Sequence, residues 1–417
     1  NTVSDALGHC VELLRSNDSR PRQVLATSRA HPIHGSYGRG GAEESKICAR
    51  VKALLLRSGV GDRAEIRCAV FHRGQASLQQ LFRVGEPSPY GWYYGKAVEF
   101  ARALSQQPAL RESTAAAVLV TEDDATLPPA AVAQLRKAGA PLLAHSIQRS
   151  SKAGAILIPD WHFIGSKGFE PTVTQLKRSP MFARAPMLYW RGSTTGRPCA
   201  RPYVDASRPA ELARCSGACD NLQRVQVARR LLNVTWADVK FTQVLDFCSG
   251  HAERLSAEGL VQNSRSTEES WGAFRGVLDV DGHVNAWGLY WRLASGSAVF
   301  RVESEQTNAY IEQMRPFVHY VPIAANLSDL LPRTALVASN QIEDVRFLSH
   351  LAQAGRLLSL NFTWEAELSR VADELASATR ESRLKEDKTP ARPPMKDRHA
   401  RLKQDREEKK DADTDKQ

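Results

Sequence analysis

The chain has 417 residues, of which 42% are hydrophobic and 24% charged, and it carries a net charge of +10. These values are ordinary for a soluble globular protein of two or three domains with a large apolar core. The longest apolar runs, such as Ala115–Val120 and Ala155–Pro159, fall far short of the roughly 18 residues that cross a bilayer. We therefore expect no transmembrane helix, and an N-terminal signal is not visible in this chain.

Short apolar runs alternate with amphipathic stretches along the chain, a pattern that predicts an α/β protein with parallel sheets. In chain order, the expected strands are Ala116–Val120, Ala155–Ile158, Met187–Trp190, Arg275–Val280, Ala298–Val302 and His319–Pro322. The expected helices are Gly95–Leu104, Ala130–Ala138, Asn221–Leu232, Gln341–Ala354 and Thr363–Ala378.

Polar, acidic or glycine-rich residues follow the first three of these strands. The segments concerned are Thr121–Asp124, Pro159–Phe163 and Arg191–Arg197. Sheets of α/β proteins bind their ligands at the carboxyl ends of the strands. The pattern therefore predicts an active-site cleft between two such sheets.

The segment Arg191–Arg197 has the residues of a phosphate-binding loop. Gly192 and Gly196 allow the backbone to approach a ligand closely. The hydroxyl of Ser193, its threonine neighbours and the two flanking guanidinium groups can donate hydrogen bonds to phosphate oxygens. An ordinary Gly/Thr-rich loop with two surface arginines is the alternative that these residues leave open.

Two pairs of aspartates each allow a chemical and a structural interpretation. Asp123 or Asp124 could act as a general base, although a helix N-cap is favoured on the residues alone. Asp279 and Asp281 form an Asp-x-Asp sequence that could hold a divalent cation, but we favour strand alternation followed by an Asp-Gly turn at Gly282.

Three aromatic rings follow the second expected strand. Trp161, His162 and Phe163 could stack on a nucleotide base. A Trp or Phe just after a strand more often belongs to the core, so both interpretations are kept.

Three of the seven cysteines, Cys199, Cys215 and Cys219, cluster in a Pro/Arg/Ser-rich stretch. Half of a zinc site is conceivable there, but no second Cys/His pair lies at a fitting distance, so a local disulfide is favoured if the chain is secretory. Four N-glycosylation sequons, which permit a lumenal location without establishing it, begin at Asn17, Asn233, Asn326 and Asn361.

The last part of the chain differs from the rest in composition. Residues 381–417 contain 12 Lys or Arg and 10 Asp or Glu with almost no large apolar side chain, which predicts a disordered or partly helical tail. The remaining residues have a dispersed excess of +8 without a basic run or a nucleic-acid motif. A solvated surface is therefore favoured over nucleic-acid binding.

Taken together, four segments resemble glycosyltransferase family ninety, which includes the Rumi-type protein O-glucosyl- and O-xylosyltransferases and capsule-associated glycosyltransferases. They are specific as an ordered set, within a similarity that runs from about Thr121 to Ala378. The four segments are Met187-Leu-Tyr-Trp-Arg-Gly-Ser-Thr-Thr-Gly196, Leu278-Asp-Val-Asp-Gly-His-Val-Asn-Ala-Trp287, Leu293-Ala-Ser-Gly-Ser-Ala-Val-Phe300, and Pro316-Phe-Val-His-Tyr-Val-Pro-Ile323 followed by Leu327-Ser-Asp-Leu330.

The resemblance implies a GT-B-like α/β fold of two Rossmann-like domains facing a cleft. The expected divisions are an acceptor-side domain (1–185), a nucleotide-sugar-binding domain (186–345), a C-terminal helical segment (346–380) and a disordered charged tail (381–417).

The resemblance also assigns roles to residues. Asp123 inherits the role of catalytic base, while Gly288 stands where the family carries an Arg. Arg292, one helical turn on, can take over from that Arg if the segment is helical. The residues expected to contact the donor are Trp161, His162, Phe163, Arg191, Gly192, Ser193, Arg197, Gly282, Asn285, Ala286, Trp287 and Arg292.

The expected activity is an inverting, metal-independent transfer of glucose or xylose from a UDP-sugar to a hydroxyl of a protein or polysaccharide. No cofactor, nucleic acid or membrane span is expected, and the family implies the lumen of the endoplasmic reticulum or Golgi. The alternative is a catalytically weak or inactive member that binds a nucleotide sugar or glycan, which Gly288 motivates.

Overall fold

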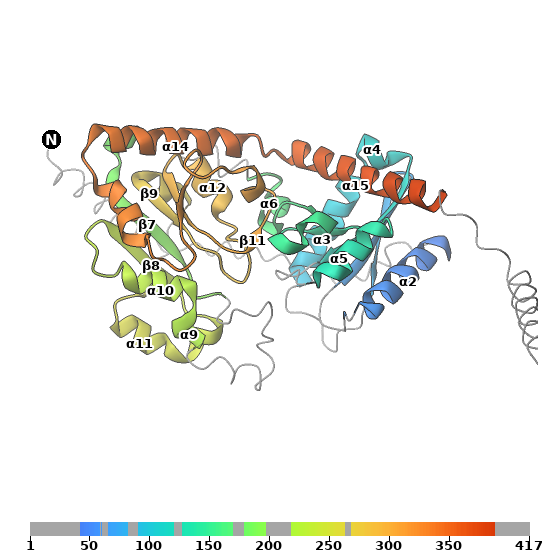
Figure 1. Cartoon of the computed structure of the whole chain (residues 1–417), viewed down its shortest axis with the longest axis horizontal. Helices are drawn as coiled ribbons and strands as arrows, with labels where there is room; N and C mark the ends of the chain where they lie inside the picture. The colour runs from blue at the N-terminus through green and yellow to red at the C-terminus, as the bar shows by residue number, and fades with distance from the viewer. Residues whose placement is uncertain are drawn as a thin grey trace, which may run out of the picture.

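The computed structural model describes residues 42–58, 60, 66–81, 91–120, 127–169, 179–196, 218–262 and 268–387. Figure 1 shows two lobes side by side, with the two long C-terminal helices running along both of them. We call residues 42–169 the N-terminal lobe and residues 179–362 the C-terminal lobe. None of the helices in the described ranges is long and apolar enough to span a membrane.

The N-terminal lobe contains a mixed sheet with the strand order β2-β1-β3-β4-β6. β3, β4 and β6 are parallel, whereas β1 runs antiparallel to β2 and β3. The expectation of a purely parallel arrangement is thus wrong here, because Arg73 and Gly74 adopt positive φ and close a tight β1–β2 hairpin. The strands are β1 (Ile66–His72), β2 (Gln75–Gln80), β3 (Thr114–Val120), β4 (Leu142–Ala144) and β6 (Ala155–Leu157).

The C-terminal lobe contains a five-stranded sheet with the order β12-β10-β9-β7-β8. Each neighbouring pair in it is parallel, as the sequence predicts. The strands are β7 (Ala185–Ser193), β8 (Ala237–Gln243), β9 (Phe274–Asp279), β10 (Ala298–Val302) and β12 (Val321–Ile323). A small two-stranded sheet of β5 (Ile147–Gln148) and β11 (Gln306–Thr307) joins the lobes.

The five expected helices are present as α3, α5, α10, α14 and α15, whereas the 16-residue helix α2 and the short helices were not expected. Those that pack in the N-terminal lobe are α2 (Ala42–Arg57), α3 (Gly91–Ser105), α4 (Pro108–Arg111), α5 (Pro129–Lys137), η1 (Arg149–Gly154), α6 (Trp161–Ser166) and α15 (Trp364–Asp387). Those of the C-terminal lobe are η2 (Met181–Ala183), α9 (Ala218–Asn221), α10 (Gln223–Arg230), η3 (Asp246–His251), α11 (Ala252–Ala257), η4 (Glu268–Ala273), α12 (Leu289–Ala294), η5 (Ile311–Gln313), α13 (Leu330–Thr334), η6 (Ala335–Ala338) and α14 (Ile342–Leu360).

The central strand β3 is apolar from Ala115 to Val120 because both faces of its sheet are covered. Ala116, Val118 and Val120 pack in one core cluster with α2 and α5. Its alternate residues, including Leu119, pack in a second cluster with α3 and α15. A strand buried on both faces reads as a continuous apolar run, which is why the sequence identifies it.

Two disulfides tie helices to neighbouring elements. Cys48 on α2 is bonded to Cys68 on β1, and Cys219 on α9 is bonded to Cys248 in η3. Cys219 therefore pairs outside the cysteine cluster, contrary to the expected local disulfide. The other two members of the cluster, Cys199 and Cys215, lie outside the described residues.

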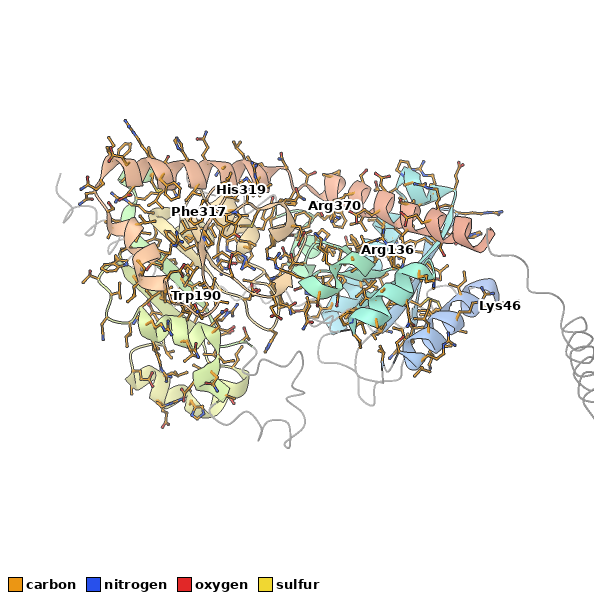
Figure 2. The ribbon with its side chains drawn as sticks, viewed as in Figure 1. Lys46, Arg136, Trp190, Phe317, His319 and Arg370 are labelled. Carbon is orange, nitrogen blue, oxygen red and sulfur yellow. A yellow bond between two sulfur atoms is a disulfide. The ribbon has the colours of Figure 1, made fainter. Side chains whose placement is uncertain are left out.

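Helix α15 leaves the C-terminal lobe and returns to the N-terminal lobe. Arg370, labelled in Figure 2, donates a hydrogen bond from Nη2 to the carbonyl oxygen of Leu157 at 2.7 Å. The helix continues to Asp387, past the point at which we expected the tail to begin. Buried Ser382 donates to the carbonyl oxygen of Lys137 at 3.2 Å, so a polar contact holds this end of the helix. Residues 388–417 lie outside the described residues.

Truncation of the chain after Arg380 should lower the free energy of unfolding by about 1 kcal/mol, because it removes the Ser382 hydrogen bond. Truncation after Asp387 keeps that contact and should leave the melting temperature unchanged. Thermal unfolding of the two truncated chains and the full chain measures the difference. Equal melting temperatures for all three would show that the end of α15 contributes nothing.

Candidate active site at the carboxyl edges of the two sheets

The carboxyl edges of the two sheets meet through the segments that follow their strands. Ser146, just after β4, donates a hydrogen bond from Oγ to Oδ1 of Asn285 in the segment after β9, at 2.7 Å. Next to this contact, β5 pairs with β11, and the backbone N–H of Arg149 donates to the carbonyl oxygen of Glu305 at 2.9 Å. Ligands of α/β proteins bind at such edges, so the chemistry is expected here.

The start of α6 places an imidazole beside the C-terminal lobe. The His162 ring lies 4.1 Å from the Trp287 ring, measured between centroids. Trp161 and Phe163 are both buried in the core, at 1% and 0% exposure, so the structure favours the core interpretation for these two rings. Of the three aromatic residues that follow the second expected strand, His162 is thus the partly exposed one.

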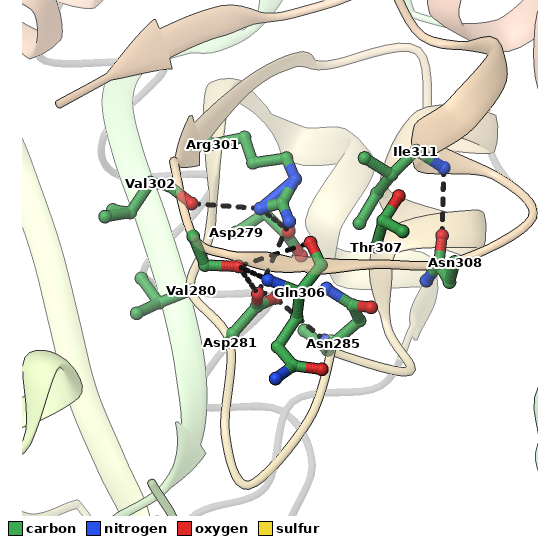
Figure 3. A network of polar contacts seen from close by, with 12 residues as sticks. Asp279, Val280, Asp281, Asn285, Arg301, Val302, Gln306, Thr307, Asn308 and Ile311 are labelled. Atoms are coloured by element: carbon green, nitrogen blue, oxygen red, sulfur yellow. Dashed lines mark hydrogen bonds and ion pairs between the residues drawn. The ribbon is translucent and has the colours of Figure 1, made fainter. Parts of the chain in front are cut away.

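The segment after β9 is folded around the carboxylate of Asp281. Asn285 donates from Nδ2 to Oδ2 of Asp281 at 3.0 Å, and the backbone N–H of Ala286 donates to Oδ1 at 3.2 Å (Figure 3). The Ser304 hydroxyl donates to the same carboxylate. These bonds fix Asn285 and Ala286, which we predicted to contact the donor, and they bring Trp287 to His162.

Two arginines neutralise the two aspartates of the Asp-x-Asp sequence. Arg292 forms an ion pair with Asp279, and Arg301 lies 3.6 Å from Asp279 and 3.4 Å from Asp281, nitrogen to oxygen (Figure 3). All four side chains are buried. Within the described ranges, no group of three His, Cys, Asp or Glu could hold a metal ion.

For the Asp-x-Asp sequence, the favoured interpretation is correct about where the strand ends and the chain bends, but the expected strand alternation is wrong. Asp279 ends β9, and the chain then bends where the N–H of Gly282 donates to the carbonyl oxygen of Val284 at 2.9 Å. All six residues of β9 are buried, so the strand does not alternate. Both faces of the sheet are covered at β9, as they are for other central parallel strands.

Arg191 is engaged inside the protein. Its guanidinium donates to Oδ2 of Asp238 at 2.6 Å and to Oε1 of Gln262 at 2.7 Å, and it lies over the ring of Tyr189. These contacts direct the side chain toward the start of β8. The geometry therefore gives no support to the predicted contact between Arg191 and a donor phosphate.

Arg224 on α10 occupies the space at the ends of β7 and β9. Its Nη1 donates to the carbonyl oxygen of Ser193 at 3.1 Å and to Oγ1 of Thr195 at 2.7 Å. Its Nε donates to the carbonyl oxygens of Val280 and Asp281. Burial lowers the pKa of Arg224 to about 10, so the guanidinium remains charged at neutral pH. Sequence analysis missed this residue, because nothing distinguishes it from the other arginines of an amphipathic helix.

Gly282 is the glycine that the Arg224 side chain requires. A Cβ at position 282 would lie 2.8 Å from Oγ1 of Thr195 and 3.0 Å from Nη2 of Arg224. Ser193 contributes its hydroxyl 3.2 Å from Oγ1 of Thr195, and Gly192 precedes it at the end of β7. Of the predicted residues, Ser193 and Gly282 therefore lie beside Arg224.

Gly288 and Arg292 form a second unit of this kind. The segment is helical, with the N–H of Arg292 donating to the carbonyl oxygen of Gly288 at 3.0 Å. A Cβ at position 288 would lie 2.9 Å from Cζ of Arg292, so the guanidinium lies directly over the glycine. Nε of Arg292 is buried without a hydrogen-bond partner in the described part of the chain. The structure thus places a guanidinium beside Gly288, the position at which the resemblance implies an arginine.

Three predicted residues lie outside the described ranges: Asp123, Asp124 and Arg197. β3 ends at Val120, and it is parallel to β4, whose end carries His145 and Ser146. The end of β3 therefore lies at the edge of the N-terminal sheet that faces the C-terminal lobe.

Gly288→Ala should lower the free energy of unfolding by about 1–3 kcal/mol, because the buried guanidinium of Arg292 has to move. Gly95→Ala is the matched control, since an added Cβ on that exposed face of α3 meets nothing within 4 Å. The control should gain about 0.5–1 kcal/mol. Urea unfolding measures the free energy of unfolding of both variants. If Gly288→Ala is as stable as the control, the placement of the Arg292 guanidinium over Gly288 is contradicted.

Comparison with known proteins agrees with this geometry. The Glycosyl transferase family 90 profile matches residues 117–346, which include the second half of β3, the strands from β4 to β12 and the segments described at the two edges. Protein O-glucosyltransferase 2 of Danio rerio is 39% identical over 56 residues, which are 13% of this chain and 11% of the relative. Protein O-glucosyltransferase 3 of Rattus norvegicus is 35% identical over 80 residues, 19% of this chain and 15% of the relative.

A third relative, uncharacterized protein 179R of Invertebrate iridescent virus 6, is 28% identical over 74 residues, 16% of this chain and 6% of the relative. Each alignment thus spans less than a fifth of the relative. The family profile, in contrast, covers more than half of the chain, including the whole C-terminal sheet and the parallel part of the N-terminal sheet from the end of β3 onward. The chain belongs to glycosyl transferase family 90.

Proposed function

We propose that this glycosyltransferase moves glucose or xylose from a UDP-sugar to a hydroxyl group of a protein or glycan, with inversion at the anomeric carbon. The observation that carries the proposal is the meeting of two carboxyl edges, one rich in arginine and the other including the end of β3, three residues before Asp123 in the sequence. The arrangement of the two lobes is consistent with a GT-B-like enzyme. The naming of two relatives as O-glucosyltransferases supports glucose as the first donor to test.

The charge at the end of the C-terminal sheet favours an anionic donor. Arg224, Arg292 and Arg301 lie there with Asp279 and Asp281, so guanidinium groups outnumber carboxylates. The excess positive charge and the N–H groups near Gly282 can stabilise a diphosphate leaving group. Among the three arginines, Arg292 is the best candidate for contacting the diphosphate, because its Nε has no hydrogen-bond partner in the described residues.

The N-terminal lobe would supply the base. In the proposed step the Asp123 carboxylate takes the proton of the acceptor hydroxyl, whose oxygen attacks the anomeric carbon. The bond between that carbon and the diphosphate oxygen breaks, and UDP leaves with the electron pair. Attack by the acceptor oxygen and departure of UDP occur in a single displacement, so no covalent intermediate with the enzyme is needed.

Metal independence is proposed because the Asp-x-Asp carboxylates already have partners. Asp279 is held by Arg292 and Arg301, and Asp281 accepts bonds from Asn285, Ala286 and Ser304. A cation would have to displace buried guanidinium groups to bind there. The arginines would instead offset the negative charge that develops on UDP.

The alternative function is a nucleotide-sugar- or glycan-binding protein without activity, which the glycine at position 288 suggests. The Arg292 guanidinium over Gly288 weighs against it, since the charge is retained in nearly the same place. UDP release from UDP-glucose and UDP-xylose, with and without acceptor, separates the two functions.

A lumenal location is proposed from the same relatives and from the surface of the chain. Both described disulfides favour an oxidising compartment. Of the sequons, Asn233, Asn326 and Asn361 lie in the described ranges, and all three are exposed.

Asp123→Asn should reduce sugar transfer by about 10²–10⁴ while UDP binding persists, because the base touches the acceptor and not the nucleotide. Asp124→Asn is the neighbouring control and should change transfer little, since asparagine caps helices about as well as aspartate does. Transfer rate and UDP affinity are measured for both. Loss of transfer in Asp124→Asn alone would shift the base by one residue, and retained transfer in both variants would show that Asp123 is not the base.

Treatment with EDTA should leave transfer nearly unchanged, because the arginines already compensate the charge at this edge. The assay is UDP release before and after chelation, with manganese added back. Complete loss with EDTA and recovery with manganese would overturn metal independence and restore the cation-binding interpretation of Asp279 and Asp281.

A further inference from the structure

The buried carboxylate of Asp160 joins the two lobes beside the candidate site. Its Oδ1 accepts the backbone N–H groups of His162 at 2.8 Å and Phe163 at 3.0 Å, and its Oδ2 accepts the hydroxyl of Tyr310 at 3.2 Å. The two N–H groups belong to the first turn of α6, whereas Tyr310 belongs to the C-terminal lobe. One side chain therefore sets the position of α6 relative to the other lobe.

The ionised form of this group opposes the stability of the fold. Burial raises the pKa of Asp160 to about 6 from an ordinary 3.8, although its hydrogen bonds and Lys96 act in the other direction. Because the folded chain binds the proton more tightly, the stability that this group contributes is lost as pH rises through about 6. At neutral pH the chain therefore retains a buried charge at a cost.

The hydrogen bonds of Asp160 do not explain why this position holds a carboxylate and not a neutral side chain. An asparagine at position 160 could accept the same two N–H groups with Oδ1 and donate from Nδ2 to the oxygen of Tyr310. Asparagine also caps helices as well as aspartate does. A neutral residue would thus hold the same elements together without the cost of burial.

The charged groups around Asp160 show what the carboxylate acts on. Lys96 of α3 faces it, and a Cβ at Gly165 would lie 2.8 Å from Nζ of Lys96, so the ammonium lies against α6. Burial lowers the pKa of Lys96, which Asp160 and Glu99 raise. The other titratable groups nearby are His145 and His162, both with a pKa lowered by burial to about 4, and Tyr310, which Glu367 of α15 also influences.

We propose that Asp160 is a positioning residue, whose charge and interlobe hydrogen bond hold the His162–Trp287 pair in the arrangement that the donor requires. Asp160 attracts the Lys96 ammonium to one side of α6 and binds Tyr310 on the other. His162, two residues along, is thereby fixed against Trp287 at 4.1 Å. The inference rests on the proposed function, because the His162–Trp287 pair is proposed to contact the sugar donor.

The decisive variant is Asp160→Asn, with Asp344→Asn at the start of α14 as the matched control. Asp344 accepts a hydrogen bond from Ser339 and is remote in sequence from both edges. At pH 8, Asp160→Asn should melt at the same or a higher temperature than the unaltered chain, yet its kcat/KM for UDP-glucose should fall about tenfold or more. The control should change kcat/KM less than twofold. A parallel loss of melting temperature and activity would show a merely structural role and overturn the proposal.

Two further measurements keep this test separate from that of the proposed function. The melting-temperature advantage of Asp160→Asn should shrink from pH 8 to pH 5 as Asp160 of the unaltered chain takes up its proton, whether or not transfer is observed. An advantage that is constant over this range, or absent at pH 8, overturns the charge argument. Tyr310→Phe removes the interlobe bond but keeps the carboxylate, and it should raise the KM for UDP-glucose. An unchanged KM overturns the interlobe part of the proposal.

Discussion

Two aspartates and two arginines buried at the end of β9 hold the candidate site together. Asp279 has no exposed surface, and an unpaired carboxylate in such a place would cost several kcal/mol. Arg292 and Arg301 supply the opposing charges, and Arg301 also reaches Asp281. Asp281 in turn binds Asn285 and the N–H of Ala286, which shapes the segment that touches the N-terminal lobe. The contacts between the lobes therefore depend on charges that are neutralised inside the C-terminal lobe, and loss of any one partner would leave a buried opposite charge with fewer partners.

The lobes are joined on several sides of this network, so the two carboxyl edges are held in a defined relation. Ser146 binds Asn285, Asp160 binds Tyr310, and β5 pairs with β11. On the outer side, Lys152 forms an ion pair with Glu312, and α15 returns from the C-terminal lobe to cover the N-terminal sheet (Figure 1). A transfer between two substrates benefits from such an arrangement, because correct placement of the reacting groups supplies a large part of the rate.

The volume left by nearby glycines, more than membership of a sequence motif, decides where the arginine side chains of this site lie. The Arg292 guanidinium fills the volume over Gly288, so the two residues together do what one longer side chain at 288 could do. Arg224 reaches the ends of β7 and β9 from a helix, and Gly282 leaves room for it. Arg191, in the most arginine- and glycine-rich motif, is instead bound to Asp238 and Gln262. A motif that looks suited to phosphate can thus serve the sheet, while a helix supplies the charge near the ligand.

The sequence by itself determined most strands of the C-terminal sheet and five of the helices, because their residues are buried in regular patterns. β10 lies over the whole expected range Ala298–Val302, and α14 begins within one residue of its expected start. The sequence did not indicate α2, β1, β4, β2 or β8, and the last two are partly exposed and lack a continuous apolar run. It also placed His162, Asn285 and Trp287 among the site residues, but only the tertiary structure showed that they meet. Arg224 and Tyr310 were decided by the fold alone, because a side chain's partners across two lobes leave no pattern in its neighbouring residues.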